Sequence, residues 1–216
     1  MIVPPRVLVR GTLAALLSAA VLTGCGAGAT RAHSSAPYHW TGAEVVKPLV
    51  KPEFTLTDQN GSTFDFQRDS DGKVTLLYFG YTHCPDICPE NMALLAFALK
   101  QMPAGVRSHI AVVFVTTDPA RDTPAVLASW LGNFHEGFTG LTGDKAQVDL
   151  AQAQARVSLA SAELAAPGSN YYVDHAAQII AYTPDNLAHI LFFQGMPSAG
   201  VARDLERLVN TGWTGA

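Results

Sequence analysis

Two long apolar segments mark the centre of a predicted β-sheet. Residues 73–81 and 110–115 are apolar on both faces of an extended chain, a pattern typical of strands that are covered on both sides. Asn60-Gly61 is a strong hairpin signal between two shorter strand segments. The other segments with strand-like patterns are 54–57, 63–66, 171–182 and 188–194. Together they predict a hairpin, two central strands and a later pair of strands.

Four segments place their apolar residues at helical spacing. They are 90–102, 123–133, 144–159 and 198–210. Pro124 suits a helix that starts there, because the first turn of a helix does not use that backbone N–H. Strands and helices alternate, and an antiparallel pair of strands precedes the last helix. We therefore expect an α/β three-layer sandwich with a mixed central sheet and an N-terminal β-hairpin.

The first 24 residues have the features of an export signal. Arg6 and Arg10 precede an apolar segment, 11–22, that is shorter than the ~20 residues a membrane-spanning helix needs. The small residues directly before Cys25 are similar to a bacterial lipobox. We therefore expect 1–24 to be a lipoprotein signal peptide and Cys25 to carry a lipid on the extracytoplasmic face of the cell membrane. An ordinary cleaved signal or an uncleaved anchor is the alternative.

Composition divides the rest of the chain into a tether and one domain. Residues 25–47 are rich in the small residues Gly and Ala and lack a periodic apolar pattern, so we expect a flexible tether there. Residues 48–216 are expected to form a single domain, since 48% of the chain is hydrophobic. The formal net charge is −4 and lysine and arginine do not cluster. This composition argues against nucleic acid as a partner.

If Cys25 carries a lipid, two cysteines remain for other chemistry. Cys84 and Cys88 follow the predicted strand 73–81, at the end of the strand where α/β proteins place their sites. We expect Pro89 to be the first residue of the next helix, so that both thiols lie at a helix N-terminus, which favours thiolates. Their offset of four places the pair within reach of one metal ion or of a disulfide. A buried strand that leads to cysteines at a helix start is the thioredoxin-like arrangement.

Two thiolates are an incomplete site for most metals, so a third ligand is expected from elsewhere in the chain. His175 lies where a loop enters the predicted strand 171–182, and in a thioredoxin-like topology this position faces the cysteines. By position alone His175 is either a ligand or a packed histidine. His83 adjoins Cys84 but points to the opposite side of an extended chain. The other five histidines are expected to be solvated or packed: His33, His39, His109, His135 and His189.

Four segments of the chain carry a resemblance to a known family. They are FGYTHCPDICP at 79–89, TDPARDTP at 117–124, YVDH at 172–175 and the opening hairpin at 54–61. Together they resemble the Sco/SenC family, the copper proteins of cytochrome c oxidase assembly. The cysteine segment together with the histidine segment makes this resemblance specific, and it covers roughly residues 48–210.

The resemblance implies a thioredoxin-like fold and a copper ion, Cu(I) or Cu(II), held by Cys84, Cys88 and His175. It also implies that Asp86 lies beside the copper site without being a ligand. Many relatives have Ser or Thr after the histidine, whereas this chain has Ala176, which removes a potential hydrogen bond near the ligand. The implied function is a metallochaperone. Its implied partner is the copper-bearing subunit of cytochrome c oxidase or another copper chaperone.

Four alternatives to a copper chaperone stay open at this point. Cys84 and Cys88 could cycle between dithiol and disulfide, which would make the chain a thiol-disulfide oxidoreductase acting on the oxidase subunit or another copper protein. A peroxidase would need Thr82 and Arg121 beside one activated cysteine. Zinc could replace copper if a fourth ligand such as His83 or Asp86 joined the site. A purely structural disulfide across so short a loop would add little stability.

Overall fold

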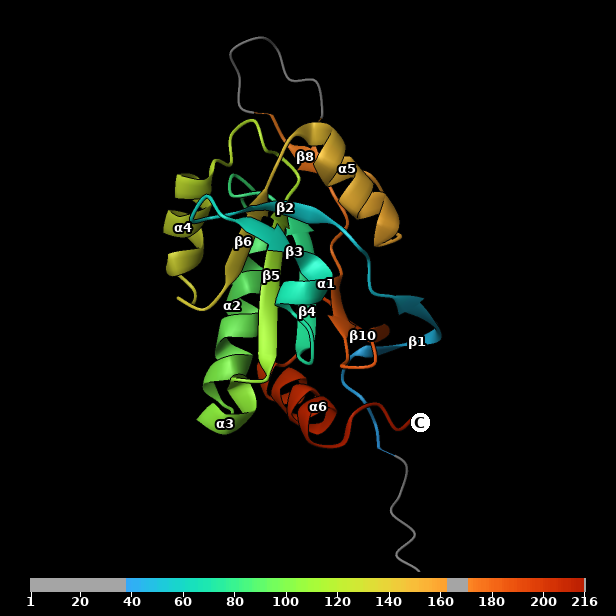
Figure 1. Ribbon diagram of the computed structural model, residues 1–216. Coiled ribbons are helices and arrows are strands. Elements are labelled where there is room, and N and C mark those ends of the chain that lie inside the picture. Colours follow the sequence, from blue (N-terminus) through green and yellow to red (C-terminus); the bar gives the residue numbers. More distant parts are fainter. Residues whose placement is uncertain (1–37, 163–170, 216) are drawn as a thin grey trace, which may run out of the picture. The chain divides into compact units, whose positions relative to one another are not determined.

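The computed structural model describes residues 38–162 and 171–215. The expected signal peptide 1–24 and Cys25 lie outside the described residues. The described part forms an eight-stranded sheet with helices on both faces (Figure 1). In spatial order, the strands are β1 (Ala43–Val50), β10 (Leu187–Phe192), β9 (Ile179–Tyr182), β4 (Val74–Gly80), β5 (Ile110–Thr116), β6 (Thr139–Thr142), β2 (Thr55–Asp58) and β3 (Thr63–Asp65).

The two continuous apolar segments are the central strands, as predicted. β4 and β5 run parallel and pair from Val74 with Ile110 to Gly80 with Thr116. β6 continues the parallel part beyond β5, whereas β9 pairs with β4 in the antiparallel direction. Every residue of β4 is buried, because both faces of this strand are covered. The sheet is therefore mixed, with its parallel strands at the centre.

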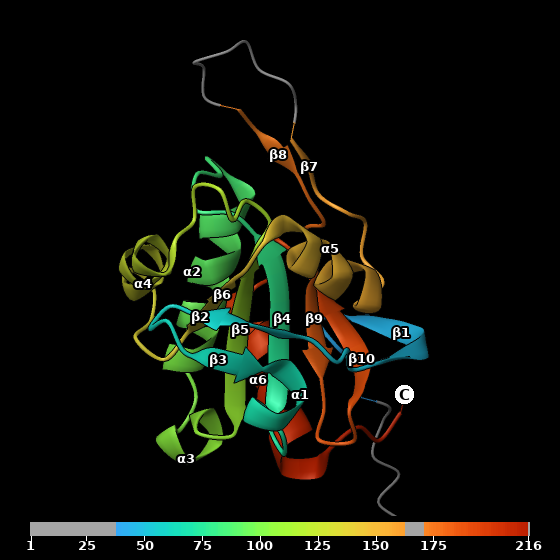
Figure 2. The same cartoon turned by 45° about the horizontal axis from the view of Figure 1, so that its top comes forward.

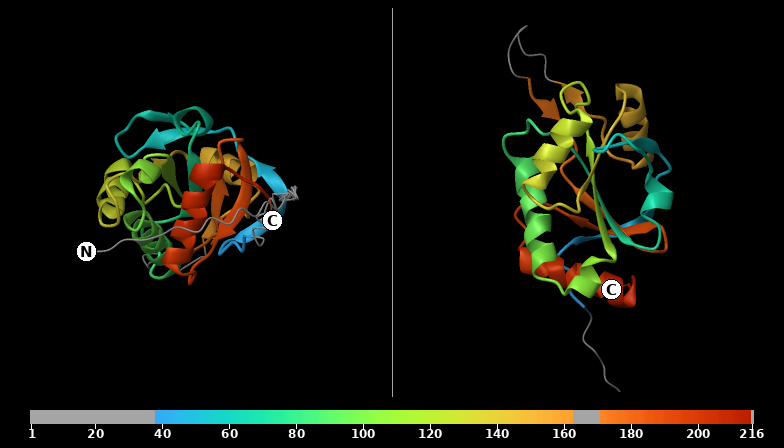
Figure 3. Two further views of the ribbon diagram at one scale, coloured as in Figure 1. Left: turned by 90° about the horizontal axis from the view of Figure 1, so that it is seen from below. Right: turned by 60° about the vertical axis from the view of Figure 1, so that its left-hand side comes forward.

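Consecutive β4 residues point to opposite faces of the sheet and contact different helices. Leu76 packs in one core with Met92 and Leu205, whereas Leu77 packs in another core with Val148. Figure 3 shows α2 and α6 on one side of the sheet and α5 on the other. The predicted three-layer sandwich is thus confirmed. The helices are α1 (Phe66–Asp69), α2 (Ile87–Lys100), α3 (Ala104–Arg107), α4 (Pro124–Gly132), α5 (Lys145–Gln154) and α6 (Ser198–Thr211).

The predicted tether 25–47 and domain start at 48 are corrected by the structure. β1 begins at Ala43 and pairs with β10. Ahead of β1, the buried carboxylate of Asp204 on α6 accepts hydrogen bonds from the Tyr38 hydroxyl and from the backbone N–H groups of Thr41 and Gly42. The folded domain therefore includes residues from Tyr38 onward, and only 25–37 of the expected tether lies outside the described residues.

The expected strand 171–182 is two strands with a break between them. β8 (Val173–Asp174) pairs with β7 (Ser161–Ala162) in a separate two-stranded sheet, which Figure 2 shows above β4 and α5. β9 then joins the main sheet. The expected helix 144–159 is also shorter and ends at Gln154. The break after β8 matters for function, because it contains His175. None of the helices in the described ranges is long and apolar enough to cross a membrane.

Candidate metal site

Cys84 lies in the turn between the central strand β4 and helix α2, and Cys88 lies in the first turn of that helix. Both thiols are free and buried. The strand ends at Gly80, where a Cβ atom would lie only 2.8 Å from the Cys88 sulfur and 2.7 Å from the Tyr78 ring. The absence of a side chain at this position therefore lets Cys88 approach the end of β4 closely.

The start of α2 differs from the prediction by two residues. The helix begins at Ile87 rather than at Pro89. Pro89 is still tolerated, because N–H groups in the first turn have no partner within the helix. One of these first-turn donors, the N–H of Cys88, lies 3.5 Å from the Cys84 sulfur. The beginning of the helix therefore contributes a backbone donor to the first cysteine.

His175 meets the two cysteines from the break between β8 and β9. Its Nε2 atom lies 3.3 Å from the Cys88 sulfur. Its Nδ1 atom lies 3.0 Å from the carbonyl oxygen of Ala176, and a proton on Nδ1 would donate to that oxygen. This bond favours the tautomer that leaves Nε2 free as a ligand. The hydrogen bond that a hydroxyl at position 176 could add is thus not needed to orient the ring.

The three side chains form one donor cluster. The sulfurs of Cys84 and Cys88 and a ring nitrogen of His175 lie within 4.8 Å of one another. Across the described ranges 38–162 and 171–215, this is the one group of three or more His, Cys, Asp or Glu side chains close enough to share an ion. The cluster unites the three residues that were expected from the sequence.

The two thiols differ in acidity because their surroundings differ. The pKa of Cys84 falls from 9.0 to about 4, chiefly because it accepts a hydrogen bond from the Cys88 side chain and further ones from the N–H groups of Asp86 and Cys88. Burial raises the pKa of Cys88, and its contact with Cys84 raises it further. The prediction of easy ionisation is right for Cys84 and wrong for Cys88, since burial outweighs the helix N-terminus there.

Two tyrosines contact the cysteine–histidine cluster. The hydroxyl of Tyr78, a fully buried residue, lies 3.5 Å from the Cys88 sulfur and can donate to it. The rings of Tyr78 and Tyr81 meet the His175 imidazole edge to face, at centroid distances of 6.0 and 5.6 Å. Edge-to-face contacts between aromatic rings are favourable, so both tyrosines stabilise this orientation of the imidazole. The imidazole is therefore pre-positioned at the thiols.

Comparison with known proteins identifies the family. The SCO1/SenC family model matches residues 43–210, which is most of the chain. The chain belongs to the SCO1/SenC family. Protein SCO2, mitochondrial, of Saccharomyces cerevisiae is 37% identical over 132 residues, which are 61% of this chain and 44% of that protein. Protein SCO1, mitochondrial, of the same yeast is 35% identical over 139 residues, which are 64% of this chain and 47% of that protein. The chain thus spans about half the length of these curated relatives.

A solved structure agrees with this membership. Bradyrhizobium japonicum ScoI with copper bound matches with a TM-score of 0.67 and 34% sequence identity, covering 73% of this chain and 98% of that one. The thioredoxin-like fold predicted from the sequence is therefore confirmed.

Asp122, in the segment that resembles the SCO1/SenC block at 117–124, fixes the loop before the cysteines. Its buried carboxylate accepts hydrogen bonds from the Thr82 N–H at 2.9 Å, the Thr82 hydroxyl at 2.6 Å and the Thr116 hydroxyl at 2.7 Å. These bonds fasten the loop to the end of β5. His83 points to the same carboxylate, with Nδ1 at 3.6 Å, and is not part of the donor cluster. It is thus placed as an outer neighbour rather than as a ligand.

Arg121 fastens the chain that leads to His175. Its guanidinium pairs with Asp118, stacks 3.6 Å from the centroid of the Tyr171 ring and donates to the Tyr171 carbonyl at 3.2 Å. The Tyr171 hydroxyl donates to Asp118 at 2.7 Å, which closes the triangle. Sequence reasoning missed Asp118 and Tyr171 as parts of the site's frame. Their position inside or next to the two matching segments was the available signal.

Asp86 takes part in the site through its backbone. Its N–H lowers the pKa of Cys84, while its side chain is exposed and makes no capping hydrogen bond to α2. The expectation that the Asp86 side chain belongs beside a bound metal stays a prediction.

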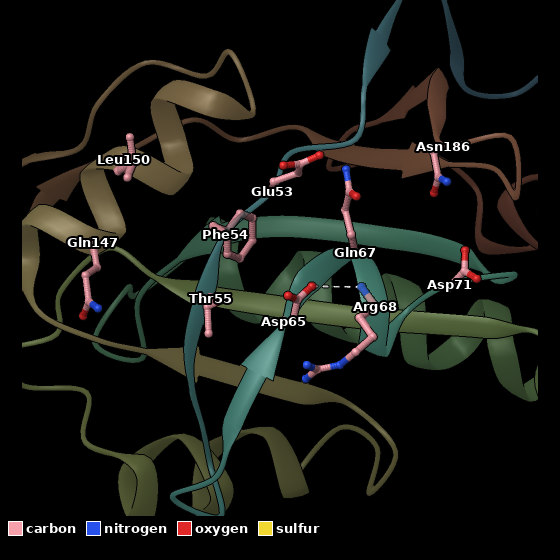
Figure 4. A pocket seen from close by; sticks show the side chains of 10 residues that line it. All are labelled: Glu53, Phe54, Thr55, Asp65, Gln67, Arg68, Asp71, Gln147, Leu150 and Asn186. Atoms are coloured by element: carbon pink, nitrogen blue, oxygen red, sulfur yellow. Dashed lines mark hydrogen bonds between the residues drawn. The ribbon is translucent and has the colours of Figure 1, made fainter.

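A hollow of about 690 Å³ lies away from the cysteines and is not part of this cluster. Figure 4 shows polar side chains around it that already serve the fold. Asp65 accepts from the Arg68 N–H at the start of α1, and Gln67 donates to the carbonyl of Lys51. The lining residues are Glu53, Phe54, Thr55, Asp65, Gln67, Arg68, Asp71, Gln147, Leu150 and Asn186. Within the described residues, the hollow therefore adds no metal ligands to Cys84, Cys88 and His175.

Proposed function

We propose that this chain binds one copper ion through Cys84, Cys88 and His175 and delivers it to a protein outside the cytoplasm. The observation that carries the proposal is the approach of two sulfurs and one imidazole nitrogen within 4.8 Å. Copper bound to the Bradyrhizobium japonicum relative supports the identity of the metal. So does yeast Sco1 with copper bound, which matches with a TM-score of 0.70 and 29% identity and covers 77% of this chain and 92% of that one.

The donor set fits copper better than zinc. Thiolates and imidazole are the ligands that Cu(I) prefers, and an added ligand would allow Cu(II). Structural zinc asks for four protein ligands, and the described residues bring together three. The Cys88 sulfur and the His175 Nε2 atom lie 3.3 Å apart, which is less than the sum of two metal–ligand bonds of about 2 Å each. The two side chains can therefore hold one ion with small adjustments.

The residues divide the work of binding and release. Cys84, with its low pKa, offers a thiolate before metal arrives. Cys88 gives up its proton only when an ion compensates the charge, because it is buried. A disulfide between the cysteines would remove both sulfur ligands. The redox state of the pair thus determines whether the chain can carry copper.

The implied recipient is the copper-bearing subunit of cytochrome c oxidase or another copper chaperone. Residues 1–24 would direct export and Cys25 would carry a lipid, which would hold the domain 38–216 near a membrane-bound recipient. A SCO1/SenC family lipoprotein from Bacillus anthracis is among the structural neighbours. Mass spectrometry of the mature N-terminus in a bacterial host tests the anchor, since a diacylglyceryl group on Cys25 is expected.

A second function is favoured by the unequal thiols. The Cys84 thiolate could attack a partner disulfide and form a mixed disulfide, releasing one partner thiolate. Cys88, once deprotonated, would then attack Cys84, which would release the second partner thiolate and leave the Cys84–Cys88 disulfide. Two electrons pass to the partner, which becomes a dithiol. This reaction would prepare a copper site in the recipient, and it uses the same two sulfurs.

Copper titration tests the first function. Every sample carries Cys25→Ser, so that Cys84 and Cys88 are the remaining thiols, and is reduced before titration against a competing Cu(I) chelator. We expect one tightly bound copper per chain and much weaker binding by His175→Ala. Weak binding by the parent that His175→Ala leaves unchanged would favour the oxidoreductase, and the reduction potential of the pair would then be the quantity to measure.

A further inference from the structure

Asn91 links α2, the helix that carries Cys88, to the segment that carries His175. It lies on α2, three residues after Cys88, and its side chain is fully buried. Its Nδ2 atom donates a hydrogen bond of 3.1 Å to the carbonyl oxygen of Ala177, two residues after His175. A single side chain thus joins the helix that carries Cys88 to the segment that carries His175.

The segment around His175 needs such a contact. β8 ends at Asp174 and β9 begins at Ile179, so the intervening residues make no strand ladder. Before His175, the chain is held by Arg121 at Tyr171. After His175, the hydrogen bond from Asn91 is the side-chain bond that reaches this break from α2. The imidazole therefore sits between two fastened points.

The buried amide of Asn91 is expected to cost folding stability, because one of its polar atoms has no partner among the described residues. The Oδ1 atom of Asn91 is buried and has no hydrogen-bond partner in the described structure. A buried polar atom without a partner destabilises the fold, and an apolar side chain at this core position would avoid that cost. The neighbouring inward-facing positions of α2 are apolar, including Met92 and Leu95. The amide at 91 is therefore better explained by the bond it makes than by packing.

We propose that Asn91 is a positioning residue, whose amide fixes the backbone at Ala177 and so holds the His175 imidazole against the cysteine pair. The proposal rests on the proposed copper function only for the identity of the ligand that His175 binds. The hydrogen bond from Asn91 to Ala177 is present in the metal-free protein and can be tested there.

The test combines Asn91→Leu with His175→Ala, singly and together, in the full Cys25→Ser chain. Gln59→Leu is the matched control. Gln59 also donates a side-chain amide N–H to a backbone carbonyl, that of Phe138 at 3.0 Å, but it lies in the turn between β2 and β3 rather than at the cysteines. Copper affinity is measured by chelator competition. In the metal-free protein, NMR reports the order of the His175 ring and the hydrogen exchange of residues 175–178.

We expect Asn91→Leu to weaken copper binding at least tenfold and the control to leave it unchanged. If Asn91 acts through His175, Asn91→Leu added to His175→Ala causes no further loss, because the group it positions is already absent. The His175 ring signals should broaden or multiply without metal. Equal losses in both backgrounds would overturn the proposal, as would an unchanged affinity or an ordered ring in Asn91→Leu.

Two provisions keep the outcome interpretable. If Asn91→Leu does not fold, Asn91→Ser replaces it, since serine is polar but too short to reach Ala177, and the same results are expected. If the parent binds no copper, the proposed function fails, but the ring order and hydrogen exchange still decide whether Asn91 holds the segment. If residues 175–178 stay ordered in Asn91→Leu, this result alone would reject the positioning role of Asn91.

Discussion

The Cys88 sulfur and the His175 Nε2 atom lie 3.3 Å apart although 87 positions separate them in the chain. Cys88 is carried by the first turn of α2, and His175 by the break between β8 and β9. The antiparallel pairing of β9 with β4 brings these two segments to the same end of the sheet. The contact is therefore a product of the sheet topology rather than of local sequence.

Removal of the His175 imidazole should weaken copper binding far more than removal of the His83 imidazole. His175→Ala deletes one of three donors and is expected to cost more than the roughly 10- to 100-fold typical of losing an outer contact. His83→Ala is the control, because His83 is next to Cys84 but faces Asp122. Chelator competition measures both. Similar losses in the two variants would contradict the assignment of His175 as a ligand.

The two cysteines should react at different rates with an alkylating agent. At pH 6 the metal-free Cys84 is a thiolate, since its pKa lies near 4, whereas Cys88 keeps its proton because burial raises its pKa. Brief treatment with iodoacetamide should therefore modify Cys84 first, as peptide mass spectrometry can show. Denatured protein, in which both thiols have ordinary pKa values, is the control. Preferential labelling of Cys88 would reverse the proposed order of attack.

The low pKa of Cys84 should make the folding stability of the metal-free protein depend on pH. The pKa of Cys84 is lower in the folded state than its ordinary value of 9.0, so its contribution is fully present above pH 9 and is lost as the pH falls toward 4. Between these values the unfolded chain binds more protons, and stability rises by up to about 1.4 kcal/mol per pH unit. Cys84→Ser should flatten this slope. Urea unfolding at pH 5, 6, 7 and 8 under reducing conditions measures it, and equal slopes would contradict the assigned pKa.

Much of this architecture could be predicted, because continuous apolar segments mark β4 and β5 independently of context. β1 could not, since most of its side chains are exposed and it contains Pro48, so its pairing with β10 leaves no apolar pattern. The two cysteines and His175 were found through motifs. Asn91 and Tyr171 were not, because their roles depend on which backbone carbonyl or carboxylate the fold brings near them. Burial of Cys88, which reversed its expected acidity, is likewise a tertiary effect.

Asp122 should matter for stability because its carboxylate is buried among three donors. Asp122→Ala leaves the Thr82 N–H and two hydroxyls without their acceptor, and we expect unfolding to become easier by about 3 kcal/mol. Asp144→Ala is a suitable comparison, since Asp144 also accepts a backbone N–H but caps α5 at the surface. Loss of an exposed cap costs about 1 kcal/mol. Urea unfolding of both variants should show the larger loss for Asp122, and a loss no greater than that of Asp144→Ala would mean that the loop before the cysteines is held by other contacts.

The boundary of the folded domain can be tested by truncation. A fragment 48–216 lacks the start of β1 and the donors from Tyr38, Thr41 and Gly42, so the buried carboxylate of Asp204 would lose all three. We expect this fragment to be less stable than 37–216 by several kcal/mol, because a buried charge without partners is costly. Asp204→Ala should destabilise 37–216 but stabilise 48–216, since in the shorter fragment it removes a buried charge that has lost its partners. Equal stability of the two fragments would restore the domain start at 48, and equal effects of Asp204→Ala in both would show that the carboxylate stabilises α6 rather than the chain that leads into β1.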